Sequence, residues 1–78
     1  IIWEENIGRS CDFDNRNLDT GEHCKNKFDC EKMCERTSEC THFTWSEYNA
    51  GTCWRKKGLV SRKDAFLIKY GNTICGIL

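Results

Sequence analysis

Hydrophobic and polar residues alternate in the middle of the chain, over residues 41–46. The segment is rich in residues that favour β-structure, and its alternation places Phe43 and Trp45 on one face and the polar side chains on the other. A turn is predicted at residues 47–51, and residues 52–57 are predicted to return as a second strand. Because a small domain needs its large side chains inside, we expect Phe43 and Trp45 in the core.

Four further segments have weaker patterns. Residues 3–9 and 65–70 are predicted as strands, the second of them with Phe66 in the core. Residues 11–21 are rich in Asp and Asn, which favour turns, so an ordered loop is expected there. Residues 73–78 end the chain as an apolar segment.

One helix is predicted, at residues 29–37. Asp29 is the expected N-cap, because its carboxylate can accept hydrogen bonds from free amides of the first turn. Cys30 and Cys34 are four residues apart and therefore share a face of this helix, with Met33 beside them. Together these elements predict an α+β fold, with one short helix packed on a small antiparallel sheet.

The cysteine content adds most to this prediction of the fold. Seven cysteines in 78 residues indicate a disulfide-stapled single domain over residues 1–78, because so short a chain buries only a small core. Structural disulfides persist in oxidising compartments, so a secreted or extracellular location is expected. No apolar run is long enough for a membrane span, and the start lacks a signal-peptide pattern. We therefore expect a processed form or a segment of a longer protein.

Several segments occur in a characteristic order. They are Cys11-Asp12-Phe13, the Cys30-x3-Cys34 helix, residues 40–45, residues 51–56 and Cys75-Gly76-Ile77. This set resembles the PAN/apple family, in particular its short secreted members, over nearly the whole chain. Six cysteines alone allow about fifteen pairings. The resemblance implies the pairs Cys30–Cys53, Cys34–Cys40 and Cys11–Cys75, and a module that binds proteins or carbohydrates.

Cys24 departs from that family pattern. It lies in a polar segment, residues 21–27, so we expect it to be exposed. A seventh cysteine is free, capped by a small molecule, paired in place of a family cysteine, or bonded to a second chain. The last alternative would give a covalent dimer or a larger assembly.

Metal and catalytic chemistry are two rivals to a binding role. The residues that could be assembled into a zinc site are His23, Cys24, Cys30, Cys34, Cys40 and His42. Their spacing contains no Cys-x2-Cys and matches no zinc knuckle or ribbon, so neither a metal nor another cofactor is predicted. No Gly-x-Ser-x-Gly, phosphate-loop or His-Glu-x-x-His motif occurs, so no catalytic residue is assigned and the chain is not predicted to be an enzyme.

A binding module for protein or carbohydrate ligands is the function that remains. Trp54 follows Cys53 and should point to the opposite face, which makes it a better contact candidate than Trp45. Residues 55–63 carry five cations and no anion and could attract an anionic glycan, although charge runs on small domains are usually only solvated. The candidate contacts are Trp54, Tyr48, His42, Arg55, Lys56, Lys57, Arg62 and Lys63. The formal net charge is zero, and no nucleic-acid partner is expected.

An alternative function is a structural subunit that self-associates into a filament or matrix. Its candidate contacts are the apolar terminal residues Ile1, Ile2, Ile77 and Leu78, with Cys24 as a covalent link between chains.

Overall fold

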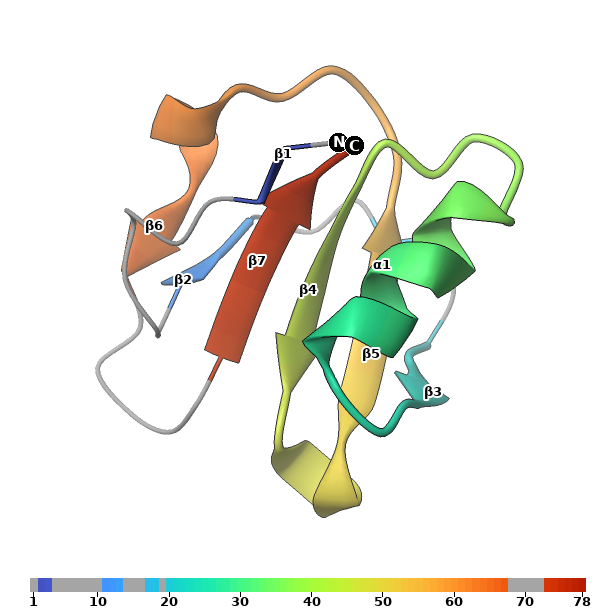
Figure 1. The fold of residues 1–78 in the computed structure, drawn as a ribbon. Helices are drawn as coiled ribbons and strands as arrows, with labels where there is room; N and C mark the ends of the chain where they lie inside the picture. Colours follow the sequence, from blue (N-terminus) through green and yellow to red (C-terminus); the bar gives the residue numbers. More distant parts are fainter. Residues whose placement is uncertain (1, 4–10, 14–16, 19, 68–72) are drawn as a thin grey trace.

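The structure is a computed structural model that describes residues 2–3, 11–13, 17–18, 20–67 and 73–78 (Figure 1). Its main element is a five-stranded sheet in which every pairing is antiparallel. The strand order is β1 (Ile2–Trp3), β7 (Thr73–Ile77), β4 (His42–Ser46), β5 (Thr52–Lys56) and β3 (Glu22–His23). The predicted hairpin is present as β4 and β5, which are joined through a short 3-10 helix at Tyr48–Ala50.

One α-helix among the described residues, α1 (Lys27–Glu35), packs against β4 and β5. It begins two residues earlier than predicted, and its N-cap is Asn26 instead of Asp29. Asn26 has an extended backbone, and its Oδ1 accepts a hydrogen bond from the Asp29 backbone N–H at 2.9 Å. Asp29 therefore lies inside the first turn, where its charge interacts favourably with the positive end of the helix. The helix and the sheet together confirm the α+β fold class.

The core has two buried clusters, one around Cys11, Phe13 and Cys75 and a larger one between α1 and the sheet. The Phe43 side chain is fully buried there, in a cluster with the cysteines of two disulfides. Cys30–Cys53 ties the helix to β5, and Cys34–Cys40 closes the segment that follows the helix. The short helix is therefore held covalently at two successive turns.

A second, two-stranded sheet contacts the main sheet through β7. It pairs β2 (Cys11–Asp12) with β6 (Phe66–Leu67), so the loop predicted at residues 11–21 begins with a strand. The segment 65–70 is not a third strand of the main sheet, and residues 68–70 lie outside the described part of the chain. Phe66 is 47% exposed, so its predicted core position is wrong. Only one face of the β2–β6 sheet can pack on the main sheet, so its other face stays exposed to solvent.

The predicted N-terminal strand at residues 3–9 is described only at Trp3, which belongs to β1, and residues 4–9 lie outside the description. β1 pairs with β7, which itself lies between β1 and β4. The apolar C-terminal segment is thus an inner strand of the sheet, between β1 and β4 (Figure 1).

Three disulfides connect these layers. The pairs are Cys11–Cys75, Cys30–Cys53 and Cys34–Cys40, the same pairs that the resemblance implies. They close 64, 23 and 6 residues of sequence, respectively. On the chain-entropy estimate these loops stabilise the fold by about 4, 3 and 2 kcal/mol, respectively. Contributions of this size are comparable to the whole stability of a typical small domain.

The structure describes the side chains of only two of the four terminal residues predicted to drive self-association. Ile1 and the side chain of Ile2 lie outside the description, whereas Ile77 and Leu78 are half-buried. Ile77 packs against the buried cluster of Cys11 and Phe13, and Leu78 packs against the cluster around Phe43. Both residues therefore contribute to the core of their own domain. No helix in the described ranges is long and apolar enough to span a membrane.

Candidate functional site

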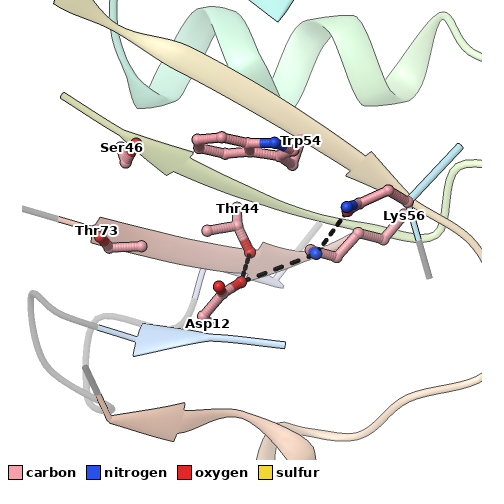
Figure 2. Close-up of a pocket in the computed structure, with 7 residues that line it drawn as sticks. Asp12, Thr44, Ser46, Trp54, Lys56 and Thr73 are labelled. Carbon is pink, nitrogen blue, oxygen red and sulfur yellow. Dashed lines mark hydrogen bonds and ion pairs between the residues drawn. The ribbon is translucent and has the colours of Figure 1, made fainter. Parts of the chain in front are cut away.

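The face of the main sheet opposite α1 contains a polar cavity of about 210 Å³. It lies beside the part of that face that the β2–β6 sheet contacts, and Figure 2 shows six of its lining side chains turned toward a common space. The lining residues are Asp12, Asn17, Thr44, Ser46, Trp54, Lys56 and Thr73. They come from β2, β4, β5, β7 and the bridge between Asn17 and Lys56.

A buried ammonium group organises the floor of this cavity. The Lys56 side chain is 3% exposed, and its Nζ donates to Asn17 Oδ1 at 2.7 Å. Asp12 Oδ1 lies 3.9 Å from the same Nζ and accepts a hydrogen bond from Thr44 Oγ1 at 2.7 Å (Figure 2). Asp12 Oδ1 also accepts from the backbone N–H of Phe13. The positive and negative charges offset each other, so the cavity is polar but carries no net charge from this pair.

The half-buried indole of Trp54 forms one wall of the cavity. A second cavity of about 200 Å³ also borders Trp54, and it includes Tyr48, whose ring centroid is 6.5 Å from that of Trp54. Gly21 allows the indole to take this position, because a Cβ at Gly21 would lie 2.7 Å from Trp54 Nε1. Gly21 also has a φ of +89°, which glycine adopts readily. Trp54 is therefore an aromatic side chain that borders two cavities.

The structure separates the predicted binding residues into different groups. Trp54 and Tyr48 both border a cavity, as expected for contact residues. His42 is fully buried and packs edge-on against Phe13 at 4.8 Å, so the prediction that it contacts a ligand is wrong. It lies on the polar face of β4, as predicted, but at the end that Phe13 covers. Lys56 lines the cavity as a buried group instead of an exposed cation.

The basic segment 55–63 does not form one charged surface. Arg55 points away from Lys56 and binds Glu22 Oε2 at 2.7 Å and Thr37 Oγ1 at 2.9 Å. Lys57 and Lys63 are exposed on the connection between β5 and β6, and the side chain of Arg62 lies outside the description.

The residues that give the cavity its polarity are not among the candidates predicted from the sequence. They are Asp12, Asn17, Thr44, Ser46 and Thr73. The alternation that buries Phe43 also places Thr44 and Ser46 on the opposite face, so the sequence pattern does indicate the position of these two residues. Asp12 and Thr73 carried no such signal, because neither β2 nor β7 was predicted as a strand.

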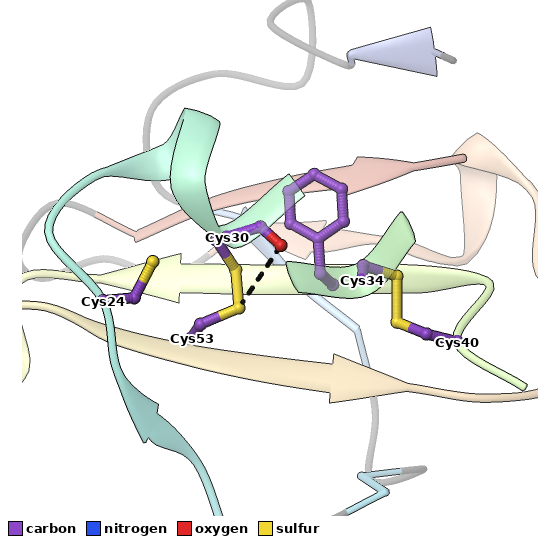
Figure 3. Close-up of a cluster of buried hydrophobic side chains, with 6 residues drawn as sticks. Cys24, Cys30, Cys34, Cys40 and Cys53 are labelled. Carbon is purple, nitrogen blue, oxygen red and sulfur yellow. Dashed lines mark hydrogen bonds between the residues drawn. A yellow bond between two sulfur atoms is a disulfide. The ribbon is translucent and has the colours of Figure 1, made fainter. Parts of the chain in front are cut away.

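A second cluster lies on the helix side of the sheet, where Cys24 approaches a disulfide (Figure 3). The Sγ atoms of Cys24, Cys30 and Cys53 all lie within 4.8 Å of one another. Cys24 is only 3% exposed, so the prediction of an exposed thiol is wrong. Its polar neighbours in sequence point outward, but the strand pairing of β3 with β5 carries Cys24 under the helix.

Burial raises the pKa of the Cys24 thiol above its ordinary value, and the nearby carboxylates of Asp29 and Glu22 add to that effect. The Cys24 Sγ–H donates to the Asn26 backbone oxygen at 3.2 Å. In the described chain Cys24 is the cysteine without a disulfide partner. Cys30, Cys34 and Cys40 of the candidate zinc set are each half of a disulfide.

The geometry thus defines a disulfide-stapled α+β domain with a polar, tryptophan-lined cavity on one face and a cystine core on the other. Comparisons with family models, with curated proteins and with solved structures found no match.

Proposed function

We propose that this chain is an extracellular recognition module that binds a neutral carbohydrate in the cavity beside Trp54. The observation that carries the proposal is the combination of a half-buried indole with three hydroxyl side chains and a charge-neutral Asp12–Lys56 pair around one cavity. Sugars present an apolar C–H face that packs on an aromatic ring, and hydroxyl groups that need a few well-placed polar partners.

The charges of the site favour a neutral ligand over an anionic one. Lys56 already has Asn17 and Asp12 as partners, and Arg55 is turned to the other face of β5. An incoming sulfate or carboxylate would compete with Asp12 for a buried ammonium group, which costs free energy. The arrangement of the side chains in residues 55–63 therefore does not support an anionic-glycan site, the less favoured of the two interpretations of that basic segment.

The described part of the surface favours a small polar ligand over a large protein partner. Among the residues whose side chains the structure describes, the large apolar ones with high exposure are Phe28, Tyr48, Leu59 and Phe66, with exposed fractions of 59%, 64%, 95% and 47%. They lie on the helix, the β4–β5 connection, the β5–β6 connection and β6, respectively, and thus on four separate elements. Protein interfaces are commonly centred on one contiguous cluster of such residues. The two cavities that border Trp54 would instead suit a short chain of sugar units.

An extracellular location is part of the same proposal. Three disulfides in so small a domain are typical of oxidising compartments. Membership of the PAN/apple family remains a prediction from the sequence, and the binding of proteins or carbohydrates that the resemblance implies agrees with the proposal.

The test is titration of the oxidised protein with neutral oligosaccharides. Cello-, chito- and manno-oligosaccharides serve as probes, and a heparin fragment serves as the anionic comparison. We expect at least one neutral probe to bind and to shift the NMR signal of the Trp54 indole N–H. Trp54→Ala should weaken that binding about tenfold, which corresponds to about 1.4 kcal/mol of lost contact. Trp54→Phe should retain part of the affinity, because it keeps an aromatic surface.

Trp45→Phe is the matched control. Trp45 lies on β4 but faces the helix side, where its Nε1 donates to the Cys24 backbone oxygen at 3.0 Å. This substitution should leave carbohydrate affinity unchanged. Binding of heparin alone, or equal losses in the Trp54 and Trp45 variants, would contradict the proposed site.

A further inference from the structure

The thiol of Cys24 is held next to one particular disulfide. Its Sγ and those of Cys30 and Cys53 lie within 4.8 Å of one another in a buried cluster (Figure 3). Two backbone hydrogen bonds fix Cys24: its N–H donates to Gly51 O at 3.0 Å, and its carbonyl accepts from Trp45 Nε1 at 3.0 Å. The thiol therefore has a defined position beside the disulfide.

Gly51 makes this close approach possible. Cys24 continues the antiparallel pairing of β3 with β5, in which Glu22 is opposite Cys53, so Cys24 comes opposite Gly51. A Cβ at Gly51 would clash with the Cys24 carbonyl group. Gly51 also has a φ of +118°, a conformation that favours glycine. Cys24 lies two residues after Glu22 and therefore on the same face of the sheet. Glu22 is the cross-strand partner of Cys53, so Cys24 and Cys53 both point toward the helix.

A thiol beside a disulfide forms the nucleophile and electrophile of thiol–disulfide exchange. The other two disulfides of the structure are not members of the three-sulfur cluster. Cys11–Cys75 belongs to the separate buried cluster on the opposite side of the sheet. The arrangement therefore directs Cys24 to Cys30–Cys53.

We propose that Cys24 exchanges with the Cys30–Cys53 disulfide, so that this protein has a second disulfide-bonded form with Cys24 paired and Cys30 or Cys53 free. The Cys24 thiolate attacks one sulfur of the disulfide, and the new S–S bond forms as the Cys30–Cys53 bond breaks. The electron pair leaves on the other sulfur, which takes up the proton that Cys24 lost. One disulfide is consumed and one is formed, so no external oxidant or reductant is needed.

The exchange changes which segments are joined covalently. In a Cys24–Cys53 form the end of β3 is bonded to β5, and α1 keeps only its Cys34–Cys40 link. In a Cys24–Cys30 form α1 is bonded to its own N-terminal segment and released from β5. Either form loosens the helix from the sheet without changing the mass of the chain.

The rate of exchange depends on pH because the attacking species is the thiolate. Burial raises the pKa of Cys24, and Asp29 on α1 and Glu22 on β3 oppose its ionisation further. Arg55 of β5 also faces this region, where it is paired with Glu22. The thiolate is therefore scarce at neutral pH, and the exchange rate should rise about tenfold per pH unit up to the pKa.

The experiment follows the position of the free thiol in the native wild-type protein. The oxidised protein is incubated at pH 7, 8 and 9 without denaturant, reductant or oxygen, then acidified and alkylated with a maleimide in acidic denaturant. Peptic digestion and mass spectrometry locate the maleimide. We expect it to move from Cys24 to Cys30 or Cys53 by a first-order process that does not depend on protein concentration. The total should stay at one maleimide per chain, and Cys24→Ser should show none.

Two further variants test the geometry itself. Cys30→Ser leaves Cys24 and Cys53 as thiols, and Cys53→Ser leaves Cys24 and Cys30. We expect air oxidation to close the remaining pair in at least one folded variant, with loss of both thiols.

The proposal is overturned if the maleimide stays on Cys24 at every pH, if it spreads equally to Cys11, Cys34, Cys40 and Cys75, or if Cys24 bonds to a second chain. It is also overturned if both folded variants keep their two thiols.

Discussion

The two faces of the main sheet are covered in different ways. On the helix side, the Phe43 ring and two disulfides exclude water from a continuous apolar cluster. On the opposite side, the small β2–β6 sheet covers one end, and a polar cavity occupies the adjacent part. Neighbouring residues of β4 serve both faces, because Phe43 points to the helix and Thr44 to the cavity. The helix side is therefore closed by a continuous apolar cluster, whereas the opposite side combines a smaller buried cluster around Phe13 with an open polar cavity.

The largest expected effect comes from breaking the helix-side face. Phe43→Ala removes a fully buried ring between the helix and the sheet, and we expect the free energy of unfolding to fall by about 3–5 kcal/mol. The neighbouring change Thr44→Val keeps the side-chain shape but loses the hydrogen bond to Asp12, and it should cost only about 1 kcal/mol. Guanidinium unfolding of the oxidised proteins measures both. Equal losses would contradict the distinction between the faces.

An intermediate effect is expected from the charge pair on the cavity side. Asp12→Asn keeps an acceptor oxygen for Thr44 but removes the negative charge beside the buried Lys56 ammonium group. We expect the free energy of unfolding to fall by about 1–3 kcal/mol, because the hydrogen bond from Thr44 loses its charged acceptor and the Lys56 ammonium group loses an ion-pair partner 3.9 Å away. Thermal and guanidinium unfolding at neutral pH provide the measurement.

Glu35→Gln is the matched control for that change. It also removes one negative charge, but Glu35 is exposed at the end of α1. Its cost should stay within about 0.5 kcal/mol, as for most surface substitutions. A double-mutant cycle with Lys56→Met then isolates the coupling between Asp12 and Lys56. Absence of coupling in the cycle would show that the pair does not organise the cavity.

The sequence predicted best those elements that depend on residues close together in the chain. The β4–β5 hairpin follows from alternation, and the helix follows from the Cys30 and Cys34 spacing, although Asn26 displaced Asp29 as the N-cap. The three disulfide pairs depended on a family resemblance, because the spacing of six cysteines leaves many alternatives open.

The cavity depends on contacts between distant parts of the chain, which local patterns do not encode. Thr44 and Asp12 are 32 residues apart, and Lys56 and Asn17 are 39 apart. The burial of Cys24 has the same origin, because its polar neighbours predict exposure while the pairing of β3 with β5 places it under the helix. His42 likewise lies on the polar face but is covered by Phe13 from the second sheet.

The smallest expected effect comes from an ion pair at the rim of the helix side. Arg55 Nη2 lies 2.7 Å from Glu22 Oε2, but the Glu22 side chain is 57% exposed. Glu22→Gln should therefore lower the free energy of unfolding by only about 0.5 kcal/mol, and the loss should shrink in 1 M salt because exposed charges are screened. A loss as large as that of Asp12→Asn would contradict the view that burial, and not charge pairing itself, distinguishes the two sites.

The Glu22→Gln substitution also removes one carboxylate that raises the pKa of Cys24. Alkylation of Cys24 at a fixed pH should accordingly become faster while stability hardly changes, which would separate the electrostatic role of Glu22 from its structural one.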